Sequence, residues 1–158
     1  MKMNTPQYTL HLDRNLQADE FGRLASLAHW GEPGDFTQER LAAHFAAVDF
    51  VAHVRDAGGF LVGYVSAISN GLGAVYLDAL LVHPEYERER VGRLLLRAML
   101  KHFQNQPVYA MPFVDEEEVF RSEGFKVYRR EMIALANRND VPTAGDLTTV
   151  DPEGIKAG

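Results

Sequence analysis

The stretch VHPEYERERVGRLLL, Val82 to Leu96, decides the fold of this 158-residue chain. It follows the nearly continuous apolar run AVYLDALLV (74–82), which predicts a strand covered on both faces in the middle of a sheet. From Val91 to Phe103, apolar residues recur at helical spacing, and basic residues lie on the opposite face of the predicted helix. The stretch therefore predicts the end of a strand, a tight charged loop and the start of a helix.

A helix N-terminus directly after a buried strand is a ready anion site, because its first backbone N–H groups are free and the helix dipole is positive there. Arg88, Arg90 and Arg93 add groups that bind phosphate oxygens, and Gly92 allows close approach of the backbone. Glutamates alternate with these arginines, so an ordinary helix start of mixed charge is the alternative. The local residues alone leave both interpretations open.

The patterns along the rest of the chain predict an α/β domain (α+β by some schemes) with the order β-α-α-β-β-β-α-β-α-β. Gly58-Gly59 marks a hairpin turn, and Gly124 is placed to end a helix. Residues 1–136 are expected to form one domain, and 137–158 a flexible tail or arm. The expected strands are 7–12, 49–56, 60–68, 74–82, 107–113 and 125–135; the expected helices are 18–30, one capped by Asp35, the one that begins in Val82–Leu96, and 115–123, with Asp115 and Glu118 as a capping pair.

Composition narrows the class of protein. Apolar residues make up 46% and charged residues 24%, as in ordinary globular domains, and a net charge of -6 argues against nucleic-acid binding. Without cysteine there is no disulfide and no thiolate site, and the six histidines show no metal spacing, so we expect no metal. No apolar run approaches about 18 residues and no signal core opens the chain, so we expect a cytoplasmic protein without a membrane partner.

The segment YLDALLVHPEYERERVGRLLLRAML (76–100) resembles the central motif of the GNAT acyltransferase superfamily, whose members bind acetyl-CoA. That motif runs strand, V-x-P-x-x, Q/R-x-x-G-x-G/A, then a leucine-rich helix, and FRSEGFKVY (120–128) resembles the closing Y-x-x-x-G-F of the family. The resemblance covers most of the chain. It implies a GNAT-like mixed, mostly antiparallel central sheet flanked by helices. It also implies direct transfer of an acetyl group from acetyl-CoA to a primary amine of a small molecule or peptide.

The resemblance also implies residue roles. Backbone groups of Leu80 and Val82 would pair with the pantetheine arm of the cofactor. The loop around Arg88, Arg90, Gly92 and Arg93 would hold its pyrophosphate. Such folds often form dimers, so a homodimer is possible.

Two positions depart from the motif. Glu87 stands where the family has glutamine or arginine, and Arg90 stands where it has glycine. A carboxylate at 87 repels a pyrophosphate unless it turns away or pairs with Arg88 or Arg90. If the loop needs a positive φ at 90, an arginine there costs about 1 kcal/mol or more. The alternative to an enzyme is therefore a degenerate GNAT-fold protein with weak or no CoA binding, acting as a binding or regulatory module.

Acyl transfer to an amine needs a group that accepts the amine proton. With period-two alternation, Tyr76, Asp78, Leu80 and Val82 would share one face of their strand. Asp78 is a carboxylate in an apolar strand, and the family often places its base at the positions of Tyr76 and Asp78. We therefore expect Asp78 to be the base, directly or through water, with Tyr76 orienting the substrate. A purely structural hydrogen bond from Asp78 to a neighbouring loop is the alternative.

Two further roles, the proton donor to the thiolate and the acceptor site, match the family only in part. Phe120 stands where the family often has the tyrosine that protonates the CoA thiolate, which leaves Tyr109, Tyr86 or water. HWGEPGD (29–35) lies where the family has its acceptor loop. Trp30 and Glu32 would suit a cationic amine, although ordinary packing is the alternative for the tryptophan.

Overall fold

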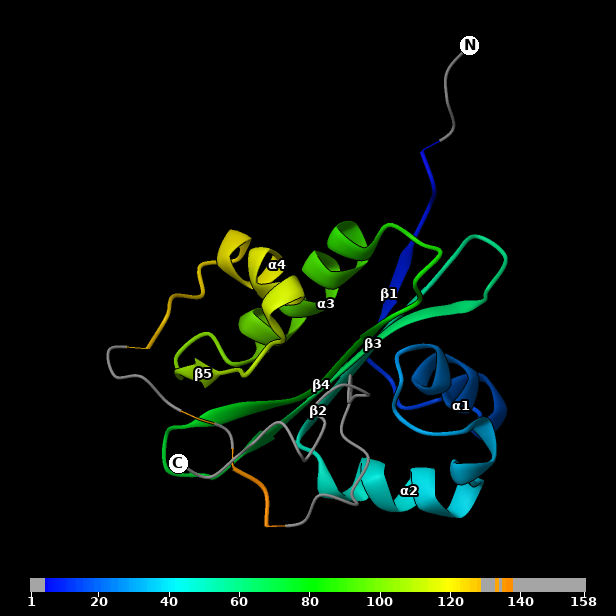
Figure 1. The fold of residues 1–158 in the computed structure, drawn as a ribbon, viewed down its shortest axis with the longest axis horizontal. Helices are drawn as coiled ribbons and strands as arrows, with labels where there is room; N and C mark the ends of the chain where they lie inside the picture. The colour runs from blue at the N-terminus through cyan, green and yellow to red at the C-terminus, as the bar shows by residue number, and fades with distance from the viewer. Residues whose placement is uncertain (1–4, 129–132, 134, 138–158) are drawn as a thin grey trace, which may run out of the picture.

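The computed structural model describes residues 5–128, 133 and 135–137. Its sheet has five strands in the order β1-β2-β3-β4-β5, in which each strand lies beside its neighbour in the chain (Figure 1). The first four strands are antiparallel and β5 is parallel to β4, which confirms the predicted mixed, mostly antiparallel sheet. The strands are β1 (Thr9–His11), β2 (Phe50–Arg55), β3 (Leu61–Ser69), β4 (Val75–Val82) and β5 (Val108–Tyr109).

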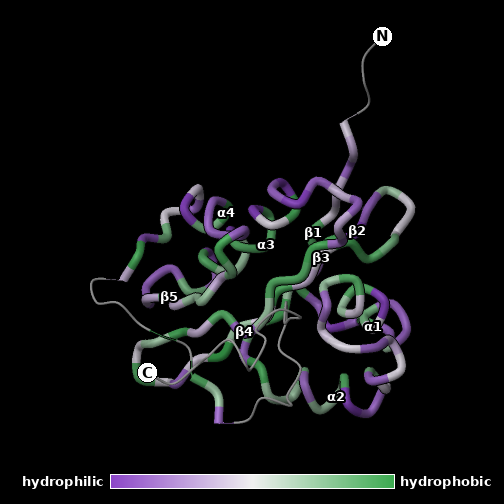
Figure 2. Tube along the Cα trace, viewed as in Figure 1, coloured by the Kyte–Doolittle hydropathy of each residue, from purple (hydrophilic) through white to green (hydrophobic). Residues whose placement is uncertain are grey.

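Helices cover both faces of the sheet. On one face lie α1 (Ala18–Leu27) and α2 (Gln38–Ala47), joined by the 3-10 helix η1 (Pro33–Asp35); on the other lie α3 (Arg88–His102) and α4 (Glu117–Ser122), preceded by η2 (Val114–Glu116) (Figure 1). The hydropathy of the chain follows these layers, with green apolar segments along the central strands and purple polar segments on the helices (Figure 2). None of the helices in the described part of the chain has the length and apolar character needed to cross a membrane.

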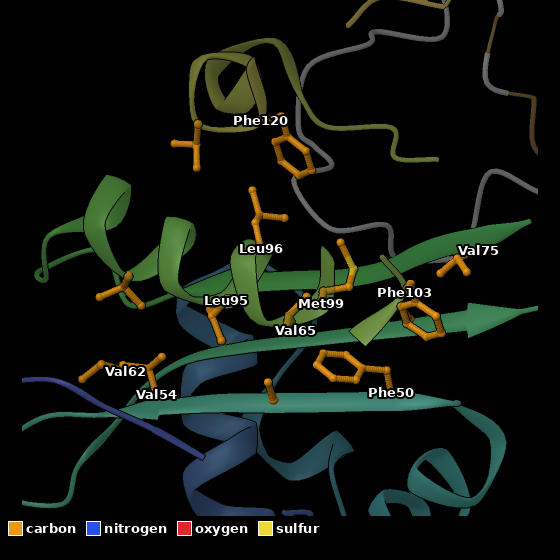
Figure 3. Close-up of a cluster of buried hydrophobic side chains, with 14 residues drawn as sticks. Phe50, Val54, Val62, Val65, Val75, Leu95, Leu96, Met99, Phe103 and Phe120 are labelled. Carbon is orange, nitrogen blue, oxygen red and sulfur yellow. The ribbon is translucent and has the colours of Figure 1, made fainter. Parts of the chain in front are cut away.

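The core on the α3 face is the larger of two hydrophobic clusters. Leu95 of α3 points toward the sheet, whereas Leu96 points toward Phe120 of α4, and all three belong to one cluster (Figure 3). Gly63 of β3 lies directly under the helix: a Cβ there would stand 2.5 Å from Cγ1 of Val91. Close packing of this kind fixes where α3 begins relative to the sheet.

A β-bulge interrupts the pairing of β3 with β4. Ser66 pairs with Ala79 and Ala67 pairs with Leu77, so Asp78 is an extra residue without a partner on β3. A bulge breaks the alternation of side chains along a strand. The expectation that residues 76, 78, 80 and 82 share one face is therefore wrong. The side chains of Leu80 and Val82 pack in the α3 core, whereas Asp78 contacts Ser66 on the α1–α2 face.

Turn and cap residues decide several boundaries. Gly59 and Gly124 adopt positive φ values of 84° and 91°, as expected for a hairpin turn and a helix end. The second helix begins later than predicted, because Thr37 is its cap and accepts the N–H of Arg40 at 3.1 Å. Asp35 instead accepts the N–H of Glu32 (2.9 Å), within η1.

The C-terminal half departs furthest from the predicted boundaries. β5 is two residues long instead of spanning 107–113, because only Val108 and Tyr109 pair with β4. Residues 115 and 116 belong to η2, and α4 starts at Glu117 without a side-chain cap. Residues 125–128 of the expected last strand have no regular structure; most of its remainder, and all of the expected tail except Asn137, lie outside the described residues.

Candidate functional site

Within residues 5–128, the edge of β4 that faces β5 is open over most of its length. β5 pairs with β4 only through Val75 and Tyr76. Beyond Tyr76, no strand within residues 5–128 pairs with this edge. Unpaired backbone N–H and C=O groups on such an edge are available to an extended ligand, as in strand addition.

The direction of the backbone groups identifies which residues serve that edge. The N–H of His83 donates to the C=O of Val62 on the β3 side, at 2.8 Å. Because backbone groups alternate along a strand, those of Leu81 also point to β3, and those of Leu80 and Val82 point to the open edge. The structure thus places the two predicted pantetheine-binding residues with their backbone groups outward, although their side chains lie in the core.

The open edge leads directly into the N-terminus of α3. This helix begins at Arg88, and its N-cap residue Glu87 makes no side-chain cap bond. The first internal bond is from the N–H of Val91 to the C=O of Glu87, at 2.9 Å. Among the described residues, the N–H groups of 88–90 have no hydrogen-bond partner. Three free donors and the positive end of the helix dipole therefore point toward the same space.

The arginines near this helix end are all paired with carboxylates. Between residues 85 and 93 there are three arginines and three glutamates, so the local charges cancel. The pairs lie at the surface, where ion pairs of this kind are worth only about 0.2–1 kcal/mol. They are Arg88–Glu116 (2.8 Å), Arg90–Glu87 (3.2 Å) and Arg93–Glu89 (3.5 Å).

Arg90 does not strain the loop. It lies in the first turn of α3, and in the described part of the chain His29 is the only non-glycine residue with a positive φ. Its guanidinium lies 5.1 Å from the ring centroid of Tyr8 and bonds Glu87. The pKa of Tyr8 is raised, first by burial and then by its hydrogen bond with Glu87. Glu87 is thus turned toward Arg90 and Tyr8, one of the two arrangements expected to relieve its repulsion of a pyrophosphate.

Gly92 lies one turn inside α3, where it faces α4. A Cβ at this position would stand 3.1 Å from Cγ1 of Val119, which is tighter than most side-chain contacts. The glycine thereby allows α4 to pack closely on α3. Its predicted contact with the cofactor stays a prediction.

Asp78 is exposed, although its apolar strand was predicted to be covered on both faces. Its Oδ2 accepts a hydrogen bond of 2.8 Å from Oγ of Ser66. Tyr76 is 50% exposed, and its ring stacks on Tyr109 with centroids 5.8 Å apart. Both predicted catalytic residues are therefore accessible, at the end of β4 where β5 departs.

The polar side chains of Ser66, Tyr64 and His44, together called the polar chain, lie behind Asp78. Ser66 and Tyr64, both 0% exposed, are two residues apart on β3, and the hydroxyl of Tyr64 lies 2.7 Å from Nε2 of His44 on α2. Burial raises the pKa of Tyr64 most, and the charge of Asp78 raises it further. Burial also lowers the pKa of His44. Sequence patterns missed this chain, although two polar residues at i and i+2 in the apolar strand 60–68 were a signal.

His44 also reaches a pocket of about 180 Å³ where α1, α2 and their connection meet. Trp30, predicted from the acceptor loop, lines this pocket. Glu32 does not; it is exposed at the start of η1. The walls are mostly aromatic or apolar, with one guanidinium and one imidazole: Phe21, Trp30, Phe36, Arg40, Leu41 and His44.

The structure also separates the candidates for the thiolate proton. Phe120 is 3% exposed and packs on Phe125, so it is a core residue. The hydroxyl of Tyr86 donates to Asp56 at 2.8 Å, and this bond raises its pKa. Tyr109 lies beside Tyr76 at the open edge, which makes it the better placed of the two tyrosines.

A second cluster of titratable groups lies at the far edge of the sheet. Ligand atoms of His11, Asp13 and His53 lie within 4.8 Å of one another, which sequence spacing did not indicate. Nε2 of His53 lies 3.0 Å from Oδ1 of Asp13, and its Nδ1 is buried without a partner in the described chain. A metal on Nε2 would move the ring proton to Nδ1 and leave a buried N–H unsatisfied. The hydrogen bond between His53 and Asp13 explains the cluster without an ion.

Comparisons with known proteins agree with this geometry. The profile of the acetyltransferase (GNAT) family matches residues 14–126. A GNAT-family acetyltransferase from Streptococcus pneumoniae has a similar structure, with a TM-score of 0.67 and 21% identity over 84% of this chain and 99% of that one. A search of curated proteins finds no match.

Two further similar structures have names that state different acceptors. An aminoglycoside 6'-acetyltransferase type Ii has a TM-score of 0.61 and 22% identity, over 75% of this chain and 83% of that one. The ribosomal-protein-S18-alanine N-acetyltransferase from Escherichia coli has a TM-score of 0.59 and 14% identity, over 76% and 78%. At such identities the likeness establishes the fold and leaves the acceptor open.

Proposed function

Because the chain belongs to the acetyltransferase (GNAT) family, we propose that it transfers the acetyl group of acetyl-CoA directly to a primary amine. The observation that carries this proposal is the open edge of β4, which the loop 83–87 joins to the free N-terminus of α3. An edge of unpaired amides suits the amide-rich pantetheine arm, and a helix N-terminus suits its pyrophosphate.

The described residues fit the cofactor. Leu80 and Val82 offer backbone N–H and C=O groups to the pantetheine amides, and the N–H groups of 88–90 offer donors to the pyrophosphate. Arg88 and Arg90 bind phosphate oxygens once they exchange their carboxylate partners for the ligand. Such an exchange costs little, because exposed ion pairs contribute only about 0.2–1 kcal/mol each.

Asp78 is the proposed base. One of its oxygens accepts the proton of the bound ammonium, directly or through one water, and the neutral nitrogen then attacks the thioester carbonyl carbon. A C–N bond forms and the C–S bond breaks, so the electron pair leaves on sulfur as a thiolate. Tyr109 is the proposed donor of the proton that this thiolate takes up, and the second proton that the acylated nitrogen loses restores Tyr109, directly or through water. Tyr76 orients the amine between Asp78 and Tyr109.

The pocket beside His44 is the proposed site of the acceptor body. Its aromatic walls, which include Trp30, suit an apolar or ring-bearing portion of the acceptor. Glu32 does not line this pocket, but it is exposed at the start of η1, where its carboxylate suits the positive charge of an amine before its proton is removed. The names of the similar structures point to both small molecules and peptides as acceptors, so both classes belong in the test.

Calorimetry with acetyl-CoA, followed by a thiol-release assay over a panel of amines, tests the proposal. We expect saturable binding and release of CoA that depends on one class of amine. Arg88→Gln gives a matched variant whose binding is expected to weaken while folding is unchanged. Absence of binding at millimolar acetyl-CoA would favour the alternative, a degenerate GNAT-fold binding module. Two observations support that alternative: the charges near the start of α3 cancel, and Phe120 is a core residue.

A further inference from the structure

We propose that the acceptor is an amine whose far end carries a carboxylate bound by Arg40, an inference that rests on the proposed function. The pocket of about 180 Å³ and the carboxylate of Asp78 lie on the same face of the sheet. Pockets that bury a whole drug-sized ligand measure about 300–1,000 Å³. The pocket therefore holds one end of the acceptor, and the amine lies outside it, toward Asp78.

Arg40 is the charged group in the wall of this pocket. Among the described residues that line the pocket there is no carboxylate, and only His44 and Arg40 can carry a charge near neutral pH. Burial lowers the pKa of His44, which leaves its ring neutral there. A single guanidinium matches a group with one negative charge, and its planar fork can bond both oxygens of a carboxylate.

Arg40 differs from most arginines of the protein because no carboxylate neutralises it. It forms no ion pair within the described part of the chain, and its Nη1 donates to the backbone C=O of Asp35. That bond fixes the guanidinium beside η1 and leaves Nη2 and Nε free of partners among residues 5–128. The arginines that do form ion pairs in the same part of the chain are Arg55, Arg88, Arg90, Arg93, Arg97 and Arg121.

The position of Arg40 in α2 adds positive potential at the pocket. Arg40 is the third residue of a helix that begins at Gln38, close to the positive end of the helix dipole. A cation there is unfavourable for the helix, so folding alone does not explain the arginine. Glu39 of the same turn does not line the pocket. The dipole and the guanidinium thus both favour an anionic group in this place.

The turn after α1 fixes Trp30 in the pocket wall. The N–H of Trp30 donates to the C=O of Ala25 at 2.8 Å, and the N–H of His29 donates to the C=O of Ser26 at 3.0 Å. These are the two bonds of a Schellman motif, in which glycine is usual at the position of His29. His29 keeps the required positive φ of 62°. The apolar wall and the guanidinium are therefore both held in place before a ligand arrives.

The separation of Arg40 from Asp78 sets the length of the acceptor. One helical turn of about 5.4 Å lies between Arg40 and His44 on α2. His44 meets Tyr64 at 2.7 Å, and about 7 Å of β3 separates Tyr64 from Ser66, which bonds Asp78. The two charges are thus on the order of 10 Å apart, too far for the amine and carboxylate of one α-amino acid. A ring between the two groups spans most of this distance, and a water beside Asp78 spans the rest.

The fluorescence of Trp30 tests the pocket without turnover, because the chain has a single tryptophan. Tranexamic acid, a cyclohexane ring with an aminomethyl group at one end and a carboxylate at the other, is compared with cyclohexylmethylamine, which lacks the carboxylate. We expect tranexamic acid to change the emission at about fivefold lower concentration, as the upper range for an exposed ion pair implies. Arg40→Gln is expected to abolish this difference. Arg23→Gln, on a guanidinium that lies over Phe60 and outside the pocket, is the control that keeps it.

The same two compounds separate the role of Arg40 from the proposed function. With acetyl-CoA, we expect kcat/KM to be about fivefold higher for tranexamic acid, and Arg40→Gln to remove this preference while leaving cyclohexylmethylamine unaffected. Equal emission titrations, including no change with either compound, or a preference that survives Arg40→Gln, would overturn the role of Arg40. Selective binding without acetylation of any amine would overturn the proposed function and leave the carboxylate site in place.

Discussion

The N-terminus of α3 and the polar chain behind Asp78 are built in opposite ways. At α3, the paired side chains of Arg93 and Glu89 are 39% and 61% exposed and lie one helical turn apart. Behind Asp78, Tyr64 and Ser66 are fully buried, and their links join residues 12 and 20 positions apart. The first region is charged and exchangeable; the second is neutral except at its end, and fixed.

This difference assigns the two regions different tasks. Exposed ion pairs can give way to an arriving phosphate at small cost, which suits reversible binding of a charged ligand. Buried hydrogen bonds are costly to break, which suits a group that must be held in one orientation. Four experiments test this contrast, and they are ordered from the largest expected effect to the smallest.

Asp78→Asn is expected to have the largest effect. It keeps the size of the side chain and its bond with Ser66 but removes the base, so kcat is expected to fall by about 100-fold or more. Acetyl-CoA affinity, measured by calorimetry, is expected to stay the same because α3 is untouched. Retained turnover would show that Asp78 is not the base and that the polar chain behind it has no role in catalysis.

Gly63→Ala tests the rigid framework beneath both regions. The added Cβ would stand 2.5 Å from Val91 and 3.0 Å from Leu95. We expect the free energy of unfolding to drop by about 1–2 kcal/mol, since overpacking outweighs the entropy that alanine saves. Denaturant titration measures this. Gly34→Ala is the matched control, because nothing lies within 4 Å of its added Cβ.

Glu87→Gln and Arg90→Gln test whether charge at α3 is exchangeable. Removing the carboxylate is expected to tighten acetyl-CoA binding about threefold, and removing the guanidinium to weaken it by a similar factor. Both effects are expected to shrink at high salt, because exposed charges are screened. Glu39→Gln on α2 is the control. Equal and salt-independent effects would mean that this region is as rigid as the chain behind Asp78.

The pH dependence of stability is the mildest test. Burial lowers the pKa of His53 most, against the opposing effect of Asp13, while Arg55 and His11 lower it further. The unfolded chain, with a histidine pKa of about 6.5, then binds more protons than the folded one below that pH. The melting temperature is therefore expected to fall as pH drops through this window. His53→Gln is expected to flatten the curve, and an unchanged curve would count against the burial effect.

Sequence patterns predicted the parts of the molecule that local rules govern. The periodicity of 91–103, the strand 74–82 and the turns at Gly59 and Gly124 depend on neighbours in the chain, and the structure confirms them. The resemblance of 76–100 to a family motif indicated the open edge and the helix end. The short length of β5 escaped prediction, because it depends on how far this segment runs beside β4.

Contacts between distant segments could not be predicted. The bulge at Asp78 arises from the pairing register of β4 with β3, and no residue type in 74–82 predicts it. The exposure of Asp78 escaped prediction for the same reason, since the bulge takes its side chain out of the alternation along the strand. His44 gave no sign of contacting Tyr64, because that pairing depends on the position of α2 over the sheet.

The open edge of β4 has a consequence for the protein outside catalysis. A row of unpaired N–H and C=O groups is a template for pairing with another chain, and thus a starting point for aggregation. A cofactor on this edge would cover it and, at about 100 times its Kd, would add about 2.7 kcal/mol to the folded state. Protein stripped of acetyl-CoA is therefore expected to precipitate first on storage, and the amount that stays in solution is expected to follow the supply of the cofactor.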